Sequence, residues 1–146
     1  MSRRTAFAVG SFLAWTVFVW GVVRVRNILG DDTISDTSRT WLLLLAASLW
    51  LPAIVLLVVL GRSLLTHREL PAPARVGVAV LGVWTTSVWL VRGADIALTS
   101  DEGAAFVAVH LVLAVVSVGL AVLAARSLRS ADPGSLRGDG VRTLSR

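Results

Sequence analysis

The sequence contains no cysteine and no lysine, and it has only two histidines among its 146 residues. Without cysteine the chain forms no disulfide, thiolate nucleophile, iron–sulfur cluster or covalently attached haem. Without lysine it forms no Schiff base with a chromophore or cofactor. The two histidines, His67 and His110, lie in different blocks of the chain and do not supply a metal-ligand set. We therefore expect no metal site and no cofactor.

Charged residues are also scarce, at 16% of the chain against 55% hydrophobic residues. Residues 104–125 carry no formal charge, and a run of about 20 apolar residues is long enough to cross a bilayer as a helix. Three more apolar blocks precede this one. The sequence thus predicts an all-α integral membrane protein, a four-transmembrane-helix bundle over residues 1–128, with spans at about residues 5–28, 41–60, 74–97 and 103–125. Residues 129–146 are rich in Gly, Ser, Arg and Asp, so we expect a disordered cytoplasmic tail.

Local signals refine these spans. The first apolar block ends in valine and arginine rather than in the small residues of a cleavage site, so we expect an uncleaved first span. Pro52 lies within the second span, where it removes an amide donor and predicts a kink. Pro71 and Pro73 lie between the second and third spans, and they predict a hinge between two halves of the protein.

The third span is the weakest of the four. Its uncharged stretch, residues 76–91, extends only about 24 Å as a helix, which is less than the roughly 30 Å of a bilayer core. Arg92 must therefore lie within the helix, and an extended span includes Asp95 as well. Thr99 and Glu102 have the spacing of a capping box, which predicts the start of the fourth span.

The positions of the arginines predict the orientation. If the N-terminus, the middle loop and the tail share one side of the membrane, that side collects ten of the fourteen arginines. The positive-inside rule then places both termini in the cytoplasm, and we expect a multi-pass protein of the bacterial cytoplasmic membrane. Because the arginines occur singly at the ends of apolar blocks, the net charge of +5 does not predict nucleic-acid binding.

Rare residues recur at a fixed spacing within the apolar blocks. The matching residues, each pair 69 positions apart, are Trp15 and Trp84, Trp20 and Trp89, and Asp32 and Asp101. This register favours a duplicated two-helix hairpin, which would give two parallel repeats related by an axis along the membrane normal. The alternative is that the tryptophans only mark the membrane interface, where tryptophan is enriched in any case.

Two stretches carry a resemblance to known proteins. They are the segment FLAW…W…RVRNI…DD within residues 12–32 and the segment AFVAVHLVLAVVS at residues 105–117. Together they resemble the two helices of small two-span actinobacterial membrane proteins. The resemblance covers mainly the first and fourth spans, and it implies a lineage and a duplicated hairpin but no activity.

Ionisable residues near the outer ends of the third and fourth spans form the candidate binding site. Arg92 and His110 lie at similar predicted depths, Asp95 is placed to pair with Arg92 at i, i+3, and Trp89 is adjacent. We expect Arg92 and His110 to face each other, with Asp95 closing the group. Ionisable residues inside a membrane are candidates for function by default, here in binding a ligand or lipid headgroup or in handling protons.

A purely structural interpretation of this cluster is equally concrete. Arg92 would extend to the headgroups, Asp95 would neutralise it, and His110 would hydrogen-bond a neighbouring backbone group or hydroxyl. Small residues on the face of His110, including Ser117, predict that this face contacts another helix. Ser117 lies two turns from His110 and no carboxylate is placed to orient the imidazole, so we expect no catalytic residues and no enzymatic activity.

Two functions remain open at this point. The first is a non-catalytic accessory, scaffold or assembly subunit that binds a larger membrane complex. The second is a small transporter or channel that works as a homo-oligomer, since four spans rarely enclose a pathway. The predicted midplane residues are Val, Leu, Ala, Ser and Trp, whereas a pathway normally needs polar or acidic residues there. The lipid bilayer is the expected surrounding in both cases.

Overall fold

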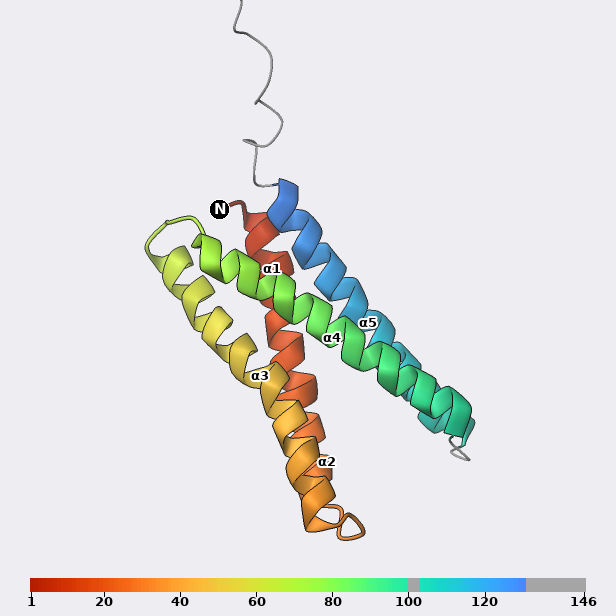
Figure 1. Ribbon diagram of the computed structural model, residues 1–146. Coiled ribbons are helices and arrows are strands. Elements are labelled where there is room, and N and C mark those ends of the chain that lie inside the picture. Colours follow the sequence, from red (N-terminus) through yellow and green to blue (C-terminus); the bar gives the residue numbers. More distant parts are fainter. Residues whose placement is uncertain (100–102, 131–146) are drawn as a thin grey trace, which may run out of the picture.

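The computed structural model describes residues 1–99 and 103–130, which form helices and their connections (Figure 1). The helices are α1 (Arg3–Thr16), the π-helix η1 (Val17–Arg24), α2 (Val25–Leu29), α3 (Asp36–Leu65), α4 (Ala72–Thr99) and α5 (Ala104–Ser130). The first three are continuous. Within the described residues, four helical units are long and apolar enough to cross a membrane: Arg3–Leu29, Asp36–Leu65, Ala72–Ile96 and Ala104–Ser130. The predicted all-α four-helix bundle is confirmed.

The helices extend beyond the predicted spans because polar residues cap them. The Ser2 hydroxyl accepts a hydrogen bond from the Thr5 amide at 3.1 Å, so α1 begins at Arg3. The Ser35 hydroxyl accepts one from the Ser38 amide at 3.3 Å, so α3 begins five residues before the predicted span. At the other end of the chain, α5 continues to Ser130. The rest of the predicted tail and the predicted capping box with Glu102 lie outside the described residues.

The prolines act at the predicted places. Pro52 lies inside α3, which remains one helix and changes direction part-way along its length (Figure 1). The connection to α4 contains His67, whose φ of 51° lies in the left-handed region. The His67 and Arg68 amides donate to the carbonyls of Leu64 and Ser63, which is a Schellman motif with histidine in the usual place of glycine. α4 then starts at Ala72, between the two prolines.

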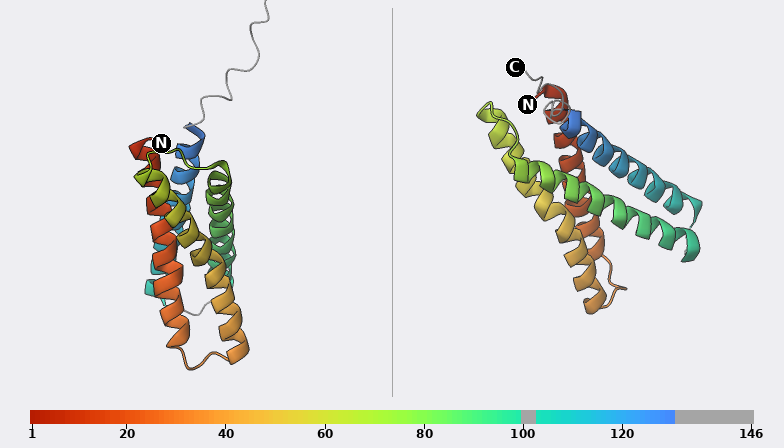
Figure 2. Two further views of the ribbon diagram at one scale, coloured as in Figure 1. Left: turned by 90° about the vertical axis from the view of Figure 1, so that its left-hand side faces the viewer. Right: turned by 45° about the horizontal axis from the view of Figure 1, so that its top comes forward.

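The four spans form a bundle in which each helix packs against two antiparallel neighbours. Contacts join α1 to α3, α3 to α4, α4 to α5, and α5 back to α1. The α1–η1–α2 unit and α4 therefore lie on one diagonal, with α3 and α5 on the other. The two hairpins converge at the end that holds Met1, the 66–71 connection and the end of α5, and they separate toward the opposite end (Figures 1 and 2). We call these the closed end and the open end.

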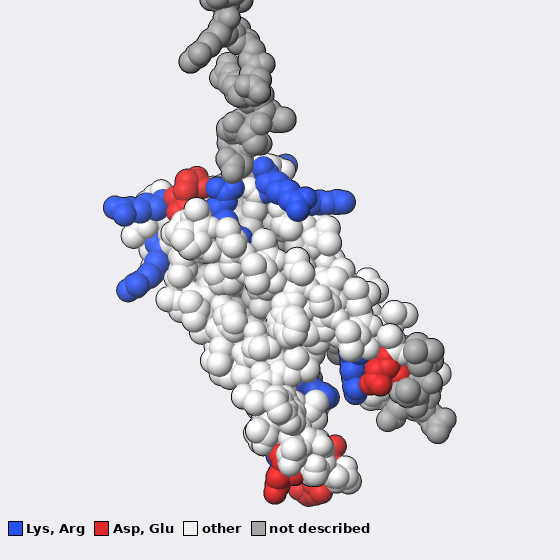
Figure 3. Space-filling view, in the orientation of Figure 1, with Lys and Arg blue, Asp and Glu red and all other residues white. Residues whose placement is uncertain are grey.

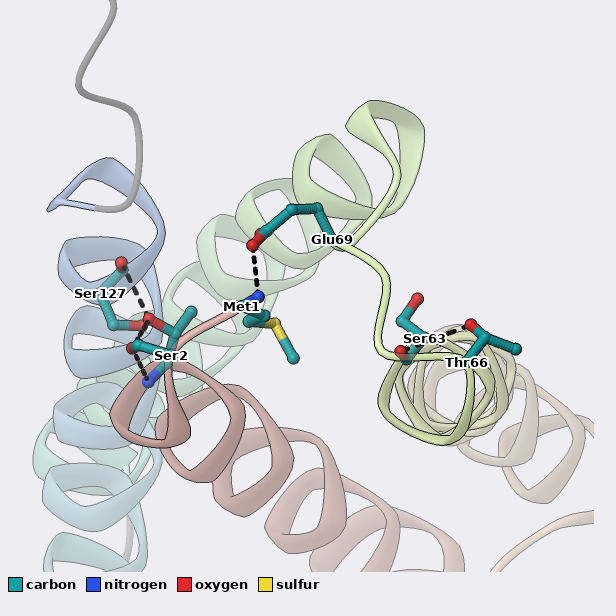
Figure 4. A network of polar contacts seen from close by, with 7 residues as sticks. Met1, Ser2, Ser63, Thr66, Glu69 and Ser127 are labelled. Atoms are coloured by element: carbon teal, nitrogen blue, oxygen red, sulfur yellow. Dashed lines mark hydrogen bonds and ion pairs between the residues drawn. The ribbon is translucent and has the colours of Figure 1, made fainter.

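Polar contacts join separate segments at the closed end (Figure 4). The Met1 ammonium group forms an ion pair with the Glu69 carboxylate of the connection between α3 and α4. The Thr5 hydroxyl bonds to the Ser2 hydroxyl and lies 3.5 Å from the Ser127 carbonyl, which ties α1 to α5. The first, middle and last parts of the bundle are thus linked on one side.

The buried core lies toward the closed end. Phe12, Leu13, Leu49 and Ala53 are fully buried between the hairpins. All the buried residues of α5 lie in its second half, from Ser117 onward, whereas residues 104–116 have none. The helices therefore pack tightly over only part of their length.

Hydrogen bonds between the hairpins follow the predicted repeat. Trp15 Nε1 of α1 donates to Ser117 Oγ of α5 at 3.0 Å, and Trp84 Nε1 of α4 donates to Ser48 Oγ of α3 at 3.0 Å. The two tryptophans are 69 residues apart, and so are the two serines. The equivalent residues Trp20 and Trp89 meet each other, with ring centroids 5.8 Å apart. Each hairpin thus makes the same bond to the other, as two repeats around an axis require.

The π-helix shifts this register by one residue. Before it, the equivalent residues of the first and third spans are 69 positions apart, as in Trp15 and Trp84. Beyond it the buried residues Ile28 and Ile96 correspond, at a spacing of 68. A π-helix bonds i to i+5 and takes up more residues per turn than an α-helix. η1 therefore accommodates one residue more than the matching part of α4.

Glycines at helix contacts provide a first test of this packing. A Cβ atom on Gly21 would lie 3.3 Å from Cγ of Trp50, whose rigid ring cannot easily move, whereas a Cβ on Gly61 meets nothing within 4 Å. We expect Gly21→Ala to lower the free energy of unfolding by about 1 kcal/mol and Gly61→Ala to raise it by a similar amount. Thermal unfolding of both variants in the same detergent measures the difference. Equal effects from the two substitutions would contradict this packing.

The bond between Trp15 and Ser117 provides a second test. Ser117 is 2% exposed, so Ser117→Ala leaves a Trp15 donor without an acceptor and should cost about 1 to 3 kcal/mol. Trp15→Phe together with Ser117→Ala removes both partners and should recover part of that loss. Ser48→Ala removes the equivalent acceptor of Trp84 and should cost a comparable amount, because exposed groups within a span face lipid and not water. A double-mutant cycle of thermal stability tests this, and strict additivity would show that the bond contributes nothing.

Candidate functional site

The predicted pair of Arg92 and Asp95 is present near the open end of α4. Arg92 Nη1 lies 2.7 Å from Asp95 Oδ2, one helical turn away. The two side chains are 42% and 49% exposed, so the pair lies at the surface of the bundle. Local helical geometry is sufficient to form it.

Trp89 does not join this pair. Its indole is buried and packs against Trp20 of the other hairpin with an interplanar angle of 60°. The Nε1 atoms of both tryptophans are buried and have no hydrogen-bond partner among the described residues. Trp89 therefore belongs to the contact between the hairpins, one turn closer to the closed end than Arg92.

The contacts of His110 lie within its own helix, so the expectation that it faces Arg92 stays a prediction. Its Nδ1 lies 3.0 Å from the Phe106 carbonyl oxygen, and its ring packs on the Phe106 ring at 4.0 Å between centroids. No hydrogen bond or ion pair between described residues links His110 to Arg92 or Asp95. A carbonyl of its own helix satisfies the imidazole, which is the arrangement that the structural interpretation predicted.

A different residue shares a site with Arg92. A pocket of about 340 Å³ opens between the hairpins, and it brings Arg24 of η1 near Arg92 of α4. The residues that line it are Arg24, Asn27, Ile28, Asp31, Thr33, Ile34, Leu42 and Arg92. Figure 3 shows basic side chains on both hairpins where they separate, with acidic side chains at the tip of the first hairpin and beside the basic side chain of the second. We call this the interhairpin pocket.

The polar groups of the interhairpin pocket differ in how they are paired. Oδ1 of Asp31 accepts hydrogen bonds from the Thr33 hydroxyl and amide, which lower the pKa of this carboxyl below its usual value, and Arg39 adds to the effect. The Asp31 carbonyl oxygen accepts a bond from Arg39 Nη2 at 2.9 Å. Arg24 is half-buried, and within the described part of the chain it has no hydrogen bond or ion pair. The charged group that acts on it is Arg92, which has the same sign.

Arg24 was missed from the sequence, although a signal for it exists. The predicted repeat has a spacing of 69 residues, at which Arg24 corresponds to Gly93. With the one-residue shift at η1 the spacing becomes 68, and Arg24 then corresponds to Arg92. Under this alignment the two arginines occupy equivalent positions in the two hairpins. An alignment of the spans that permits one insertion would have paired them.

No protein family, curated protein or solved structure matches this chain. Within residues 1–99 and 103–130, no group of three or more His, Asp or Glu side chains could hold a metal ion. The interpretation of the site therefore depends on its own side chains. These are two cations from separate helices, an amide, a hydroxyl, a carboxylate and three aliphatic residues.

The ion pair on α4 can be tested directly. Asp95→Ala leaves Arg92 uncompensated near the membrane and should lower thermal stability by up to about 1 kcal/mol, since half-exposed pairs contribute little. Arg92→Leu combined with Asp95→Ala should recover most of this loss. Asp32→Ala in the exposed connection after α2 is the control, and it should leave the midpoint unchanged. A silent Asp95→Ala would show that Arg92 reaches the headgroups without help.

Proposed function

We propose that this chain is a non-catalytic integral membrane protein that serves as an accessory, scaffold or assembly subunit of a larger membrane complex. The observation that carries this proposal is the uneven packing of the bundle. The first half of α5 exposes Val109, Leu111, Val112 and Val115, and none of residues 104–116 is buried. Connections of a few residues leave the helix faces and the basic end as the surfaces for a partner.

The polar groups support a non-catalytic role. The one imidazole within a span, that of His110, is engaged with the Phe106 carbonyl, and the Ser117 hydroxyl accepts a bond from Trp15. A hydrolytic site requires a nucleophile within hydrogen-bond reach of a base, and these two groups have other partners.

The charges support a cytoplasmic location for the closed end. The described arginines at this end are Arg3, Arg4, Arg62, Arg68, Arg75, Arg126 and Arg129. The open end has four, close to Asp31, Asp32, Asp36 and Asp95. The positive-inside rule favours this orientation. A bacterial cytoplasmic membrane is the setting that the sequence resemblance implies.

A small transporter or channel that acts as a homo-oligomer is the second candidate. The interhairpin pocket favours it, because transporter sites often lie between structural repeats. Next to the pocket, however, the buried rings of Trp20 and Trp89 pack against each other, and beyond them Phe12 and Leu13 fill the core. A pathway through one bundle would have to displace these side chains.

The orientation leads to a topology prediction. Reporter fusions at Ser35 and Ser100 should report the outside of the cell, and fusions at Ala72 and Ser135 should report the cytoplasm. The physical reason is the retention of arginine-rich segments on the cytoplasmic side. A cytoplasmic signal from Ser35 or Ser100 would invert or break the proposed topology.

The scaffold role can be tested by photo-crosslinking in cells. A photoreactive residue at Val112, on the unpacked half of α5, should give adducts with one defined membrane protein that also co-purifies in mild detergent. The matched control is Leu123, which is similarly exposed on the packed half of the same helix and should give few protein adducts. If Val112 crosslinks only to copies of this chain, and the purified oligomer moves solute into liposomes, the transporter candidate replaces the scaffold.

A further inference from the structure

The interhairpin pocket contains two like charges, and among the described residues only one of them, Arg92, has an ion pair. Arg24 has no ion pair within the described residues, and Arg92, a like charge, lines the same pocket. Asp95 pairs with Arg92 but does not line the pocket. Asp31 does line it, but among the described residues its carboxylate forms no ion pair with Arg24 or Arg92, and its Oδ1 accepts two hydrogen bonds from Thr33. Two cations brought together in a half-buried site are stabilised by an anion between them.

The symmetry of the site strengthens this interpretation. Arg24 and Arg92 are equivalent residues of the two hairpins once the extra residue of η1 is taken into account. Arg24 comes from the first hairpin and Arg92 from the second, as do Trp20 and Trp89, whose rings are in contact. A ligand with several equivalent oxygens matches such a site, because each arginine can bind two oxygens at once.

From these observations we propose that the interhairpin pocket binds a phosphate group, held between Arg24 and Arg92. Arginine guanidinium groups match the geometry of phosphate oxygens in a way that single point charges do not. The amide of Asn27 and the hydroxyl of Thr33 are further polar groups in the lining. A volume of about 340 Å³ exceeds what a phosphate ion needs, and it lies near the lower end of the range for small-molecule sites.

The remaining lining indicates what the phosphate is attached to. Ile28, Ile34 and Leu42 form an aliphatic part of the wall, and Arg24 lies five residues before the end of its span. A phosphodiester headgroup, with its glycerol part against these residues, would use both kinds of surface. A free phosphate ion would use only the polar part. The pocket would bind this group whether or not the protein serves a larger complex.

Binding should be measured on the purified full-length protein from two sources of phosphate. One series uses nanodiscs of phosphatidylcholine with and without phosphatidylglycerol, and counts retained lipids by native mass spectrometry. The other titrates inorganic phosphate against sodium chloride at equal ionic strength and follows thermal stability. Lipid retention without a phosphate effect identifies a headgroup, and a saturable phosphate effect that displaces the lipid identifies a site that also accepts the free ion.

Three arginine variants decide whether the pocket is responsible. Arg24→Gln and Arg92→Gln should each weaken binding roughly tenfold or more, since each loses charge-assisted hydrogen bonds. Arg26→Gln is the matched control, because Arg26 is exposed two residues from Arg24 and does not line the pocket. It should bind as the parent protein does. Arg24→Lys keeps the charge without the planar geometry and should be intermediate.

Two results would overturn the proposal. One is the absence of both lipid retention and a phosphate effect in the parent protein, a measurement that needs no variant to fold. The other is an equal loss of binding in Arg26→Gln and Arg24→Gln, which would indicate general attraction to a basic surface. A failure of Val112 crosslinking leaves these measurements unaffected, so the fate of the scaffold proposal and that of the phosphate site can be told apart.

Discussion

Helices in a bilayer gain little from apolar contact with one another, because lipid chains are as apolar as their own side chains. Association then depends on close packing and on hydrogen bonds between helices. In this bundle the two bonds from tryptophan to serine meet that need, since each joins one hairpin to the other. Small residues such as Ala53 and Ala121 allow close approach beside them. Where these contacts end, the hairpins separate.

The separation has a chemical result as well as a geometrical one. Beyond the contact of Trp20 and Trp89, toward the open end, the two hairpins no longer pack against each other. Polar side chains that would be costly in a packed core can therefore be accommodated there. Arg24 and Arg92 lie in this region, close to the open-end termini of the first and third spans. The same packing that holds one end together therefore creates the pocket at the other.

The fold was largely accessible from the sequence because a helix in lipid must satisfy its own backbone groups, which makes long apolar runs dependable signals. The ends of the helices were less accessible. Ser2 and Ser35 cap polar first turns that hydropathy does not detect. The residues of η1 are of the same types as those of the neighbouring α-helices, so composition does not reveal the π-helix.

The candidate site was predictable only where it is local. Arg92 and Asp95 are one turn apart on one helix, so their pairing follows from helical periodicity. The partner of His110 could not be deduced in this way, because a carbonyl on its own helix competes with residues on the next. Arg24 was hidden by the one-residue shift between the repeats.

The π-helix makes the first span tolerant of a change that the third span does not tolerate. If one apolar residue were deleted between Val17 and Arg24, the wide turn could revert to ordinary α-helix, and Arg24 would keep its face toward the pocket. The same deletion in α4, which has no wide turn, would rotate everything beyond it by about 100° and turn Arg92 away from the pocket. Hydropathy would hardly change in either case, and both segments would still be long enough to cross the membrane.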